Sequence, residues 1–377
     1  MNNSTIKAAF VSTNSISQGQ QVSLIWPSMI RDGLQIIFAY RTFIWNNEAA
    51  NKAHVHCVII GFVMGKYEGS KYIYTKNDVL ESSHINPYLN DAADVFIKSR
   101  TKPISHVPEI RFGSMPRDGG NFILSTKEKN EVLKKEPNIA PYIKSYLGAS
   151  EFLHGKERYC LWLIKATPFD ISHSKFIKNR TEKVKDFRAA SKAAGTRKFA
   201  ETPTVFAQIA QPESNYIAVP KTSSQRRKYI PLGFLDKDII ASDLLFLIPN
   251  ANLYDFGILS SIVHNAWMRS VAGRLKSDYR YSKNIVYNNF PWPSIDDKSI
   301  DRISKTAQSI LNARKLFPDS SLADLYDPLT MPIELRKAHE ANDKAVLKAY
   351  GLKPSATEPE IVQHLFKMYE KLTKKDW

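Results

Sequence analysis

The amino-acid sequence lacks the features that mark several large classes of protein. Its only cysteines are Cys57 and Cys160, and they form no CxxC pair, so neither a disulfide framework nor a cysteine-based zinc site is encoded. No apolar run approaches the ~18 residues that a membrane-spanning helix needs. The N-terminal segment MNNSTIKAAFVST has no apolar stretch long enough for a signal peptide. We therefore expect a soluble, cytoplasmic protein with no membrane partner.

Signatures of nucleotide-binding and hydrolytic sites are also missing. The sequence contains no GxGxxG, GxxxxGK[ST], GxSxG or HExxH pattern. Its nine histidines are scattered, and although His54 and His56 share one face of an expected strand, no third metal ligand accompanies them. The residues alone therefore predict no catalytic group, no metal site and no cofactor bound by this chain.

The charge balance points to an anionic partner. The chain of 377 residues is long enough for two or three domains, and its 43% hydrophobic content is ordinary for a globular protein. However, 53 Lys and Arg residues against 37 Asp and Glu residues give a net charge of +16. Residues 165–230 alone contain fourteen basic and five acidic residues. Nucleic acid is the commonest partner for such a surplus.

Apolar patterns predict an α/β region at the N-terminus, a mixed middle and a helical end. Short apolar runs are typical of strands, helical spacing is typical of helices, and glycine commonly follows a helix. The predicted strands are 6–13, an antiparallel pair 34–45 and 54–63, a β-ribbon at 71–80, then 158–164, two short strands within 202–220, and 244–248. The predicted helices are 22–33, 174–195, one that begins near 253, and those after 295.

The stretch GRLKSDYRYSKNIVYNNFPWP, residues 273–293, combines positive charge and aromatic rings. In an extended chain, Arg274, Lys276, Asp278 and Arg280 would form one face, and tyrosines would pack on the other. A DNA-binding surface needs Lys and Arg for phosphates and short polar side chains for base edges. The alternative for this stretch is a solvated loop that happens to be basic.

The same stretch carries a family resemblance. The run HNAWMRSVAGRLKSDYRYSKNIVYNNFPWP resembles the C-terminal signature of the MmeI-type adenine-N6 DNA methyltransferases of type IIG/IIL restriction–modification systems. The runs FGSMPRDGGNFILS, ERYCLWLI, VKDFRAASKAAGTRKFAETPTVFAQIAQP and SSQRRKYIPLGFL resemble successive parts of that family's target-recognition domain. The runs AAFVSTNSISQGQQVSLIWP and HVHCVIIGF resemble the last strands of its methyltransferase domain. The resemblance is collinear over nearly the whole chain.

The resemblance implies a fold and a division into domains. The expected fold is a partial class I methyltransferase α/β sheet with its last three strands, an α+β target-recognition domain and a C-terminal helical segment. We expect the methyltransferase fragment at 1–65, a connecting segment at 66–105, the target-recognition domain at 106–293 and the helical domain at 294–377.

The chain departs from the family pattern in its catalytic motifs. The Gly-rich loop that binds S-adenosylmethionine and the (N/D)PP(Y/F) motif that holds the flipped adenine are both absent, and NFPWP at 289–293 does not match the latter. S-adenosylmethionine is therefore implied only for the complete enzyme, and we expect the chain to be inactive alone. We expect the strand at 8–13 to expose its pairing edge. Either a polypeptide with the missing motifs or a homodimer would cover that edge.

The resemblance and the charge pattern together imply recognition of double-stranded DNA. We expect Lys276, Asp278 and Arg280 to read base edges, with Ser277 and Ser282 assisting. The residues expected to hold phosphates are Arg226, Arg227, Lys228, Arg269, Arg274 and Lys283. Arg117 and Asp118 in the GSMPRDGG loop are weaker candidates.

Two other functions remain open from the sequence. One is a non-catalytic regulator that binds DNA without a methyltransferase partner. The other is an unrelated enzyme whose site is assembled from scattered residues such as Asp118, His154 and Tyr279.

Overall fold

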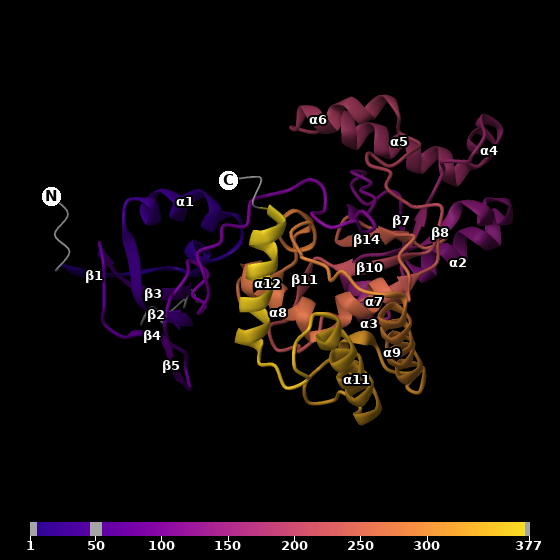
Figure 1. Cartoon of the computed structure of the whole chain (residues 1–377). Helices are drawn as coiled ribbons and strands as arrows, with labels where there is room; N and C mark the ends of the chain where they lie inside the picture. Colours follow the sequence, from indigo (N-terminus) through magenta and orange to yellow (C-terminus); the bar gives the residue numbers. More distant parts are fainter. Residues whose placement is uncertain (1–5, 46–54, 374–377) are drawn as a thin grey trace.

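The N-terminal part of the computed structural model is a twisted sheet beside one long helix; the structure describes residues 6–45 and 55–373 (Figure 1). The strands are β1 (Lys7–Thr13), β2 (Leu34–Trp45), β3 (Val55–Met64), β4 (Lys71–Tyr74) and β5 (Val79–Ser82), in the order β1-β3-β2-β4-β5. A short 3-10 turn, η1 (Asn14–Ser17), leads into α1 (Gly19–Arg31). β3 pairs antiparallel with both β1 and β2, which confirms the three expected strands.

The predicted β-ribbon extends this sheet. β4 pairs in parallel with the free edge of β2 through the pair Phe38 and Tyr72, and β5 returns antiparallel to β4. Two irregularities in the β2–β3 register bend β2. The connecting segment therefore contributes two strands to the N-terminal sheet. His54, one member of the considered histidine pair, lies outside the described residues.

β1 is the outer strand of the sheet, and in the described part of the chain its second edge pairs with no strand. Its apolar side chains Phe10 and Val11 are 65% and 51% exposed. A cavity of about 530 Å³ lies over the face formed by β1, β2, β3 and β4, lined by Lys7, Ala8, Ala9, Ile37, Phe38, Tyr40, Ile59, Tyr67, Ser70, Tyr72 and Tyr74. The expected exposed strand edge is therefore present.

The middle of the chain contains three small sheets with the orders β12-β10-β14-β6, β13-β8-β9-β7 and β11-β16-β15. Their strands are β6 (Arg111–Phe112), β7 (Ile123–Leu124), β8 (Ile143–Leu147), β9 (Tyr159–Leu161), β10 (Tyr216–Pro220), β11 (Thr222–Ser223), β12 (Gly233–Leu235), β13 (Ile240–Ala241), β14 (Leu245–Pro249), β15 (Gly273–Leu275) and β16 (Asp278–Arg280). Their helices and turns are α2 (Thr126–Lys135), η2 (Pro137–Tyr142), α3 (Ala149–His154), α4 (Pro168–His173), α5 (Lys175–Ala189), α6 (Ala194–Arg197), η3 (Lys198–Glu201), α7 (Leu253–Ser260), α8 (Ile262–Val271) and the π-helix η4 (Lys283–Tyr287). This is the expected mixture of α and β elements.

Two predicted elements differ from the structure. The helix expected at 174–195 ends at Ala189, since no side chain between positions 189 and 195 is buried to support another turn. Of the two strands expected within 202–220, only β10 forms a ladder, and Gln208 makes an isolated bridge to Met115.

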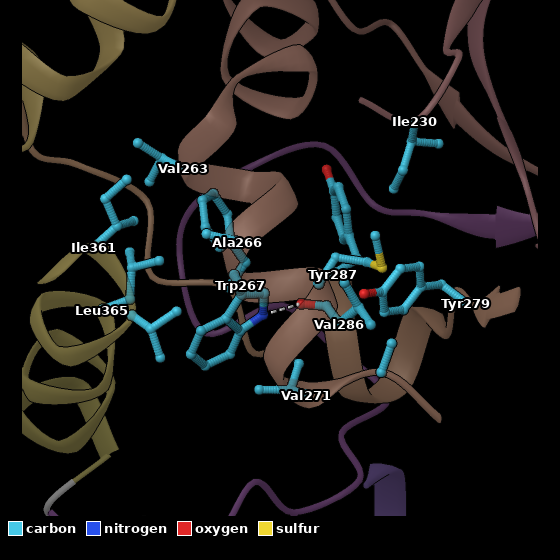
Figure 2. Packing of buried hydrophobic residues seen from close by; sticks show 14 of the residues in the cluster. Ile230, Val263, Ala266, Trp267, Val271, Tyr279, Val286, Tyr287, Ile361 and Leu365 are labelled. Atoms are coloured by element: carbon cyan, nitrogen blue, oxygen red, sulfur yellow. Dashed lines mark hydrogen bonds between the residues drawn. The ribbon is translucent and has the colours of Figure 1, made fainter. Parts of the chain in front are cut away.

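The last part of the chain is helical and completes the main core. It contains α9 (Asp297–Lys315), α10 (Leu322–Leu325), α11 (Ile333–Ala349) and α12 (Glu358–Thr373). Figure 2 shows Ile361 and Leu365 of α12 beside Val263, Ala266 and Trp267 of α8. The buried indole Nε1 of Trp267 donates to the carbonyl oxygen of Val286 at 2.9 Å.

The NNFPWP segment after η4 binds the connecting segment that follows the N-terminal sheet. The buried Asn289 accepts a hydrogen bond from Arg100 Nε at 2.9 Å, and its Nδ2 donates to the carbonyl oxygens of Lys98 and Asn284. Asn288 Nδ2 donates to the carbonyl oxygen of Arg100 at 2.8 Å. This half of the basic and aromatic stretch is therefore a structural contact, because its amides hold the backbone of the connecting segment.

Replacing Trp267 by Ala tests the contribution of α12 to this core. We expect the free energy of unfolding to fall by about 3–5 kcal/mol, because a large cavity opens between α8 and α12. Urea denaturation followed by tryptophan fluorescence and circular dichroism measures the loss. As a control, Leu316→Ala removes a side chain that is 63% exposed and should change stability by less than about 0.5 kcal/mol. Equal losses in the two variants would contradict this assignment of the core.

Candidate nucleic-acid interface

Residues 273–280 form a hairpin, where the sequence suggested a single extended run. β15 and β16 pair antiparallel, with Leu275 opposite Asp278, so Lys276 and Ser277 form a two-residue turn. Lys276 has a φ of 56°, in the left-handed region that such a turn requires. Arg280 and Lys276 are exposed, whereas Tyr279 and Tyr281 are buried. The predicted opposition of charged and aromatic faces therefore holds within β16.

Arg274 is a correction to that prediction. It lies on the neighbouring strand directly opposite Tyr279, and so on the same face of the hairpin as this tyrosine. Its guanidinium carbon is 4.1 Å from the centre of the Tyr279 ring, and its Nη2 donates to the Tyr279 hydroxyl at 3.0 Å. Its Nη1 donates to the Ser277 carbonyl oxygen at 2.9 Å. The cation thus stabilises the hairpin from within.

Tyr281 joins the hairpin to the core beneath it. The Tyr281 hydroxyl and Nε2 of His264 in α8 lie 2.9 Å apart, and both side chains are buried. Burial lowers the pKa of His264 to about 3, so the imidazole is neutral at physiological pH. We therefore assign a structural role to this histidine.

A second predicted basic segment lies beside the hairpin. β11 pairs antiparallel with β16, with Thr222 opposite Arg280. The next loop, residues 224–228, is held by the backbone N–H of Gln225, which donates to Asp278 Oδ1 at 3.3 Å. Arg226 and Lys228 are exposed in this loop. The structure thus brings the 226–228 and 276–280 segments, far apart in sequence, to one surface.

The environments of the loop cations differ. Arg226 Nη2 is 3.7 Å from Asp327 Oδ1, and the Lys228 ammonium is 5.2 Å from the centre of the Tyr229 ring. Arg227 is partly buried, and this desolvation lowers the pKa of its guanidinium. Arg226 and Lys228 are therefore the more accessible positive charges.

Lys221 belongs to this surface although sequence reasoning did not select it. Its ammonium lies 4.4 Å from the centre of the Phe112 ring and 4.0 Å from Asp243 Oδ2. Burial lowers the pKa of Lys221, and the nearby Arg280 adds to this effect. The Lys283 ammonium also lies near this ring, at 5.7 Å from its centre. A single lysine before a short strand carries no sequence signal, because only the pairing of β11 with β16 places it beside Arg280.

Several expected site residues have contacts within the protein. Arg269 donates through Nε and Nη2 to both carboxylate oxygens of Glu358 at 2.8 Å, and through Nη1 to the Lys228 carbonyl oxygen. The Arg269 guanidinium therefore joins α8 to α12. Ser282 accepts from the backbone N–H of Ile285 at the start of η4. Ser277 is half-buried in the hairpin turn.

The two candidate DNA-binding residues of the GSMPRDGG loop, Arg117 and Asp118, have different environments. Asp118 is buried and accepts from the backbone N–H groups of Gly120 and Phe122, so its carboxylate closes a turn. Arg117 is exposed, with a φ of 46°. Asp118 is therefore unavailable to a base edge, whereas Arg117 is accessible.

Family models match consecutive parts of this chain. The DNA-methyltransferase domain of MmeI matches residues 1–75, its target recognition domain matches residues 91–294, and its C-terminal domain matches residues 295–375. The chain belongs to the MmeI family. The resemblance noted in the sequence is thereby confirmed, together with the fold class that it implied.

Two relatives of this MmeI-family chain are longer proteins. DNA methyltransferase A of Bacillus subtilis (strain 168) is 41% identical over 369 residues, covering 98% of this chain and 42% of the relative. A structure of the type IIL restriction-modification enzyme MmeI in complex with DNA matches with a TM-score of 0.92 and 46% identity, over 99% of this chain and 50% of that chain. The chain thus spans about half the length of these relatives or less.

Two further observations concern only the described residues of the MmeI-family chain. Within 6–45 and 55–373, no group of three or more His, Cys, Asp or Glu side chains is placed to hold a metal ion. No helix in these ranges has the length and apolar character needed to cross a membrane.

The basic loop at 224–228 rests on a buried ionisable pair. The Tyr229 hydroxyl donates to Asp343 Oδ2 at 2.7 Å, and the backbone N–H of Ile262 donates to Oδ1 at 2.7 Å. Burial is the main cause that raises the pKa of Asp343 from 3.8 to about 6. The folded protein therefore holds a proton that the unfolded chain releases between these two pH values.

This shift predicts a pH dependence of stability. A raised folded-state pKa stabilises the fold below pH 3.8, and this contribution is lost as the pH rises through about 6, with a total of about 3 kcal/mol. Because other groups titrate in the same range, the measured quantity is the difference between the unfolding free energies of the wild type and Asp343→Asn. This difference should shift in favour of the variant from pH 4 to pH 7. A difference independent of pH would show that Asp343 does not titrate in this way.

Proposed function

We propose that this chain recognises a specific sequence in double-stranded DNA, as part of an adenine-N6 DNA methyltransferase of a restriction–modification system. The observation that carries the proposal is the hairpin, which buries its tyrosines and presents Lys276 and Arg280 beside the basic loop at 224–228. The MmeI structure with DNA, which matches this chain with a TM-score of 0.92, supports it. In this proposal residues 1–65 form the methyltransferase fragment, 66–105 the connection, 106–293 the DNA reader and 294–377 its helical support.

The side chains divide into two roles. We propose three base-reading residues. Arg280 is exposed and fits the two acceptors of guanine, and Asp278 fits the amino donor of cytosine. Lys276 at the turn is the third. We propose that Arg226, Arg227, Lys228 and Lys283 hold phosphates. Lys221 beside Arg280 joins the base-reading set by position. Arg274 and Arg269 are excluded from both sets, because their donors serve the hairpin and α12.

The family's methyl donor does not fit the residues present. S-adenosylmethionine carries a positive sulfonium and ribose hydroxyls, and a carboxylate commonly binds such hydroxyls. The cavity over the N-terminal sheet is lined by aromatic, apolar and small residues, with Lys7 as its only charged side chain. We therefore derive no step of methyl transfer from this chain.

The exposed edge of β1 supports a partner for the methyltransferase sheet. An unpaired strand with exposed Phe10 and Val11 favours pairing with another polypeptide. We propose a chain that carries the remaining strands of the same sheet and the family's catalytic motifs, with a homodimer as the second candidate.

Light scattering after gel filtration measures the mass of the assembly and so distinguishes a complex with a second polypeptide from a homodimer. Val11→Lys places a charge on the strand, which discourages edge pairing. If the sheet is completed by a second polypeptide, the unmodified chain should form a one-to-one complex with a co-expressed N-terminal half of a family methyltransferase, and Val11→Lys should prevent it. A stable dimer of the chain alone, abolished by Val11→Lys, would favour the homodimer. If the chain is a monomer alone and forms no complex with the co-expressed N-terminal half, both proposed partners are contradicted.

DNA binding tests the main proposal. Selection from a random duplex pool identifies the preferred sequence, and titration with salt on that duplex and a scrambled one then measures affinity. Arg280→Ala should cost about 1–3 kcal/mol on the preferred duplex and relax the choice at one base pair. Lys228→Ala should weaken binding to both duplexes equally and reduce the slope of log K against log salt by about 1.

A lysine outside the proposed interface provides the control for these DNA-binding titrations. Lys344→Ala changes an exposed lysine on α11 that belongs to neither proposed set of DNA contacts, and should leave affinity and selectivity unchanged. No sequence preference in the pool would refute the proposed function. Equal loss on all duplexes for both Arg280→Ala and Lys228→Ala would refute the division between base and phosphate contacts.

A further inference from the structure

A second basic surface lies away from the hairpin, at the junction of α5 and α6. Residues 189–198, which we name the α5–α6 corner, have the sequence AASKAAGTRK, and eight of these ten residues are exposed, with only Ser191 and Thr196 less accessible. The corner contains three basic residues, no acidic residue and no Asn or Gln. Figure 1 shows α5 and α6 standing clear of the sheets of this domain. Small side chains between cations allow close approach to a polyanionic backbone.

The corner is held rigidly by a buried cation. The Arg188 side chain is fully buried. Its guanidinium donates hydrogen bonds of 2.7–3.0 Å to five carbonyl oxygens, those of Pro116, Arg117, Phe199, Thr202 and Val205. All five acceptors are uncharged carbonyl groups. Arg188 therefore ties the GSMPRDGG loop to the segment after α6 and keeps its own positive charge beneath the corner.

Arg117 extends the corner towards the hairpin. A Cβ atom built on Gly195 would lie 3.9 Å from Arg117 Nη1, so the exposed Arg117 side chain borders α6. Arg117 follows Phe112 by five residues, and Lys221 and Lys283 approach the Phe112 ring. Five residues span at most about 18 Å. One turn of duplex DNA is about 34 Å, so Arg117 and the lysines around Phe112 are close enough to contact one duplex.

The composition of the corner favours phosphates over bases. Base edges are read by Asn, Gln, Asp, Glu, Arg and Lys, with Ser and Thr in support, whereas Lys and Arg also bind phosphates at any sequence. The corner has none of the first four, and Arg197 Nη1 donates to the carbonyl oxygens of Ser191 and Lys192. The ammonium groups of Lys192 and Lys198 make no ion pair within the described residues. Both lysines are exposed.

We propose that the α5–α6 corner, together with Arg117, binds the sugar–phosphate backbone of duplex DNA outside the recognised sequence. The inference rests on the proposed function, because it assigns to the same DNA a second, sequence-independent contact. The hairpin then selects the sequence, and the corner contributes affinity for any duplex long enough to reach it.

The double variant Lys192→Gln/Lys198→Gln tests the proposal, with Arg197 retained because it holds backbone carbonyls of the corner. The full chain is titrated with salt on two duplexes, one ending at the preferred sequence and one extending about two helical turns beyond it. On the long duplex the slope of log K against log salt should fall by about 2, and the ratio between preferred and scrambled sequences should not change. On the short duplex the variant should match the wild type.

A matched control is Lys344→Gln/Lys348→Gln, which removes the same charge from the exposed face of α11. A second test variant, Ala193→Glu, adds a repelling carboxylate at an exposed position without removing a side-chain hydrogen bond, and should weaken binding to the long duplex only. Thermal unfolding of all variants establishes that they fold.

The outcomes separate the two proposals. If the unmodified chain shows no sequence preference, the proposed function fails. If it does select a sequence, but Lys192→Gln/Lys198→Gln and the α11 control give the same slope on the long duplex, the corner inference alone is overturned. A changed sequence preference in the double variant would also overturn it, because the corner would then read bases.

Discussion

The burial of Tyr279 and Tyr281 is the constraint from which the recognition surface follows. Two strands of three residues are too short to be stable alone, so the hairpin depends on what its side chains contact. Tyr281 reaches His264 in the core, and Tyr279 packs against Arg274. Because side chains alternate along a strand, burying these tyrosines directs Arg280 to the opposite, exposed face. The buried tyrosines and the exposed basic side chain thus lie on two faces of one strand.

Hydrogen bonds of polar side chains fix the hairpin region to the connecting segment and to α12. The segment that follows the hairpin holds residues 98–100 through Asn288 and Asn289, and Arg269 beside it binds Glu358 of α12. These contacts are buried or bidentate, the geometry in which such bonds contribute most. Movement of the hairpin region relative to the connecting segment and α12 must therefore break several of these hydrogen bonds together.

The sequence predicted the features that depend on local pattern or on family resemblance. The apolar runs of β1, β2 and β3 and the basic character of 273–280 follow from short-range spacing. The turn at Lys276 and Ser277 was missed, because Ser277 is its only turn-favouring residue and both arms keep a period of two. Lys221, Arg269 and Arg188 take their partners from distant segments, so their roles appear only in the fold.

The packing of α12 on α8 has a consequence for how the protein is made. Trp267 faces Phe366 and Tyr369, which lie about 100 residues later in the chain and are therefore synthesised after it. A nascent chain that has completed residues 106–293 still has the α12-facing side of this indole uncovered, with Val263 beside it (Figure 2). Synthesis proceeds at about 5–20 residues per second, so that surface stays open for several seconds. This core is therefore completed only after α12 has been made, and chaperones have that interval in which to act.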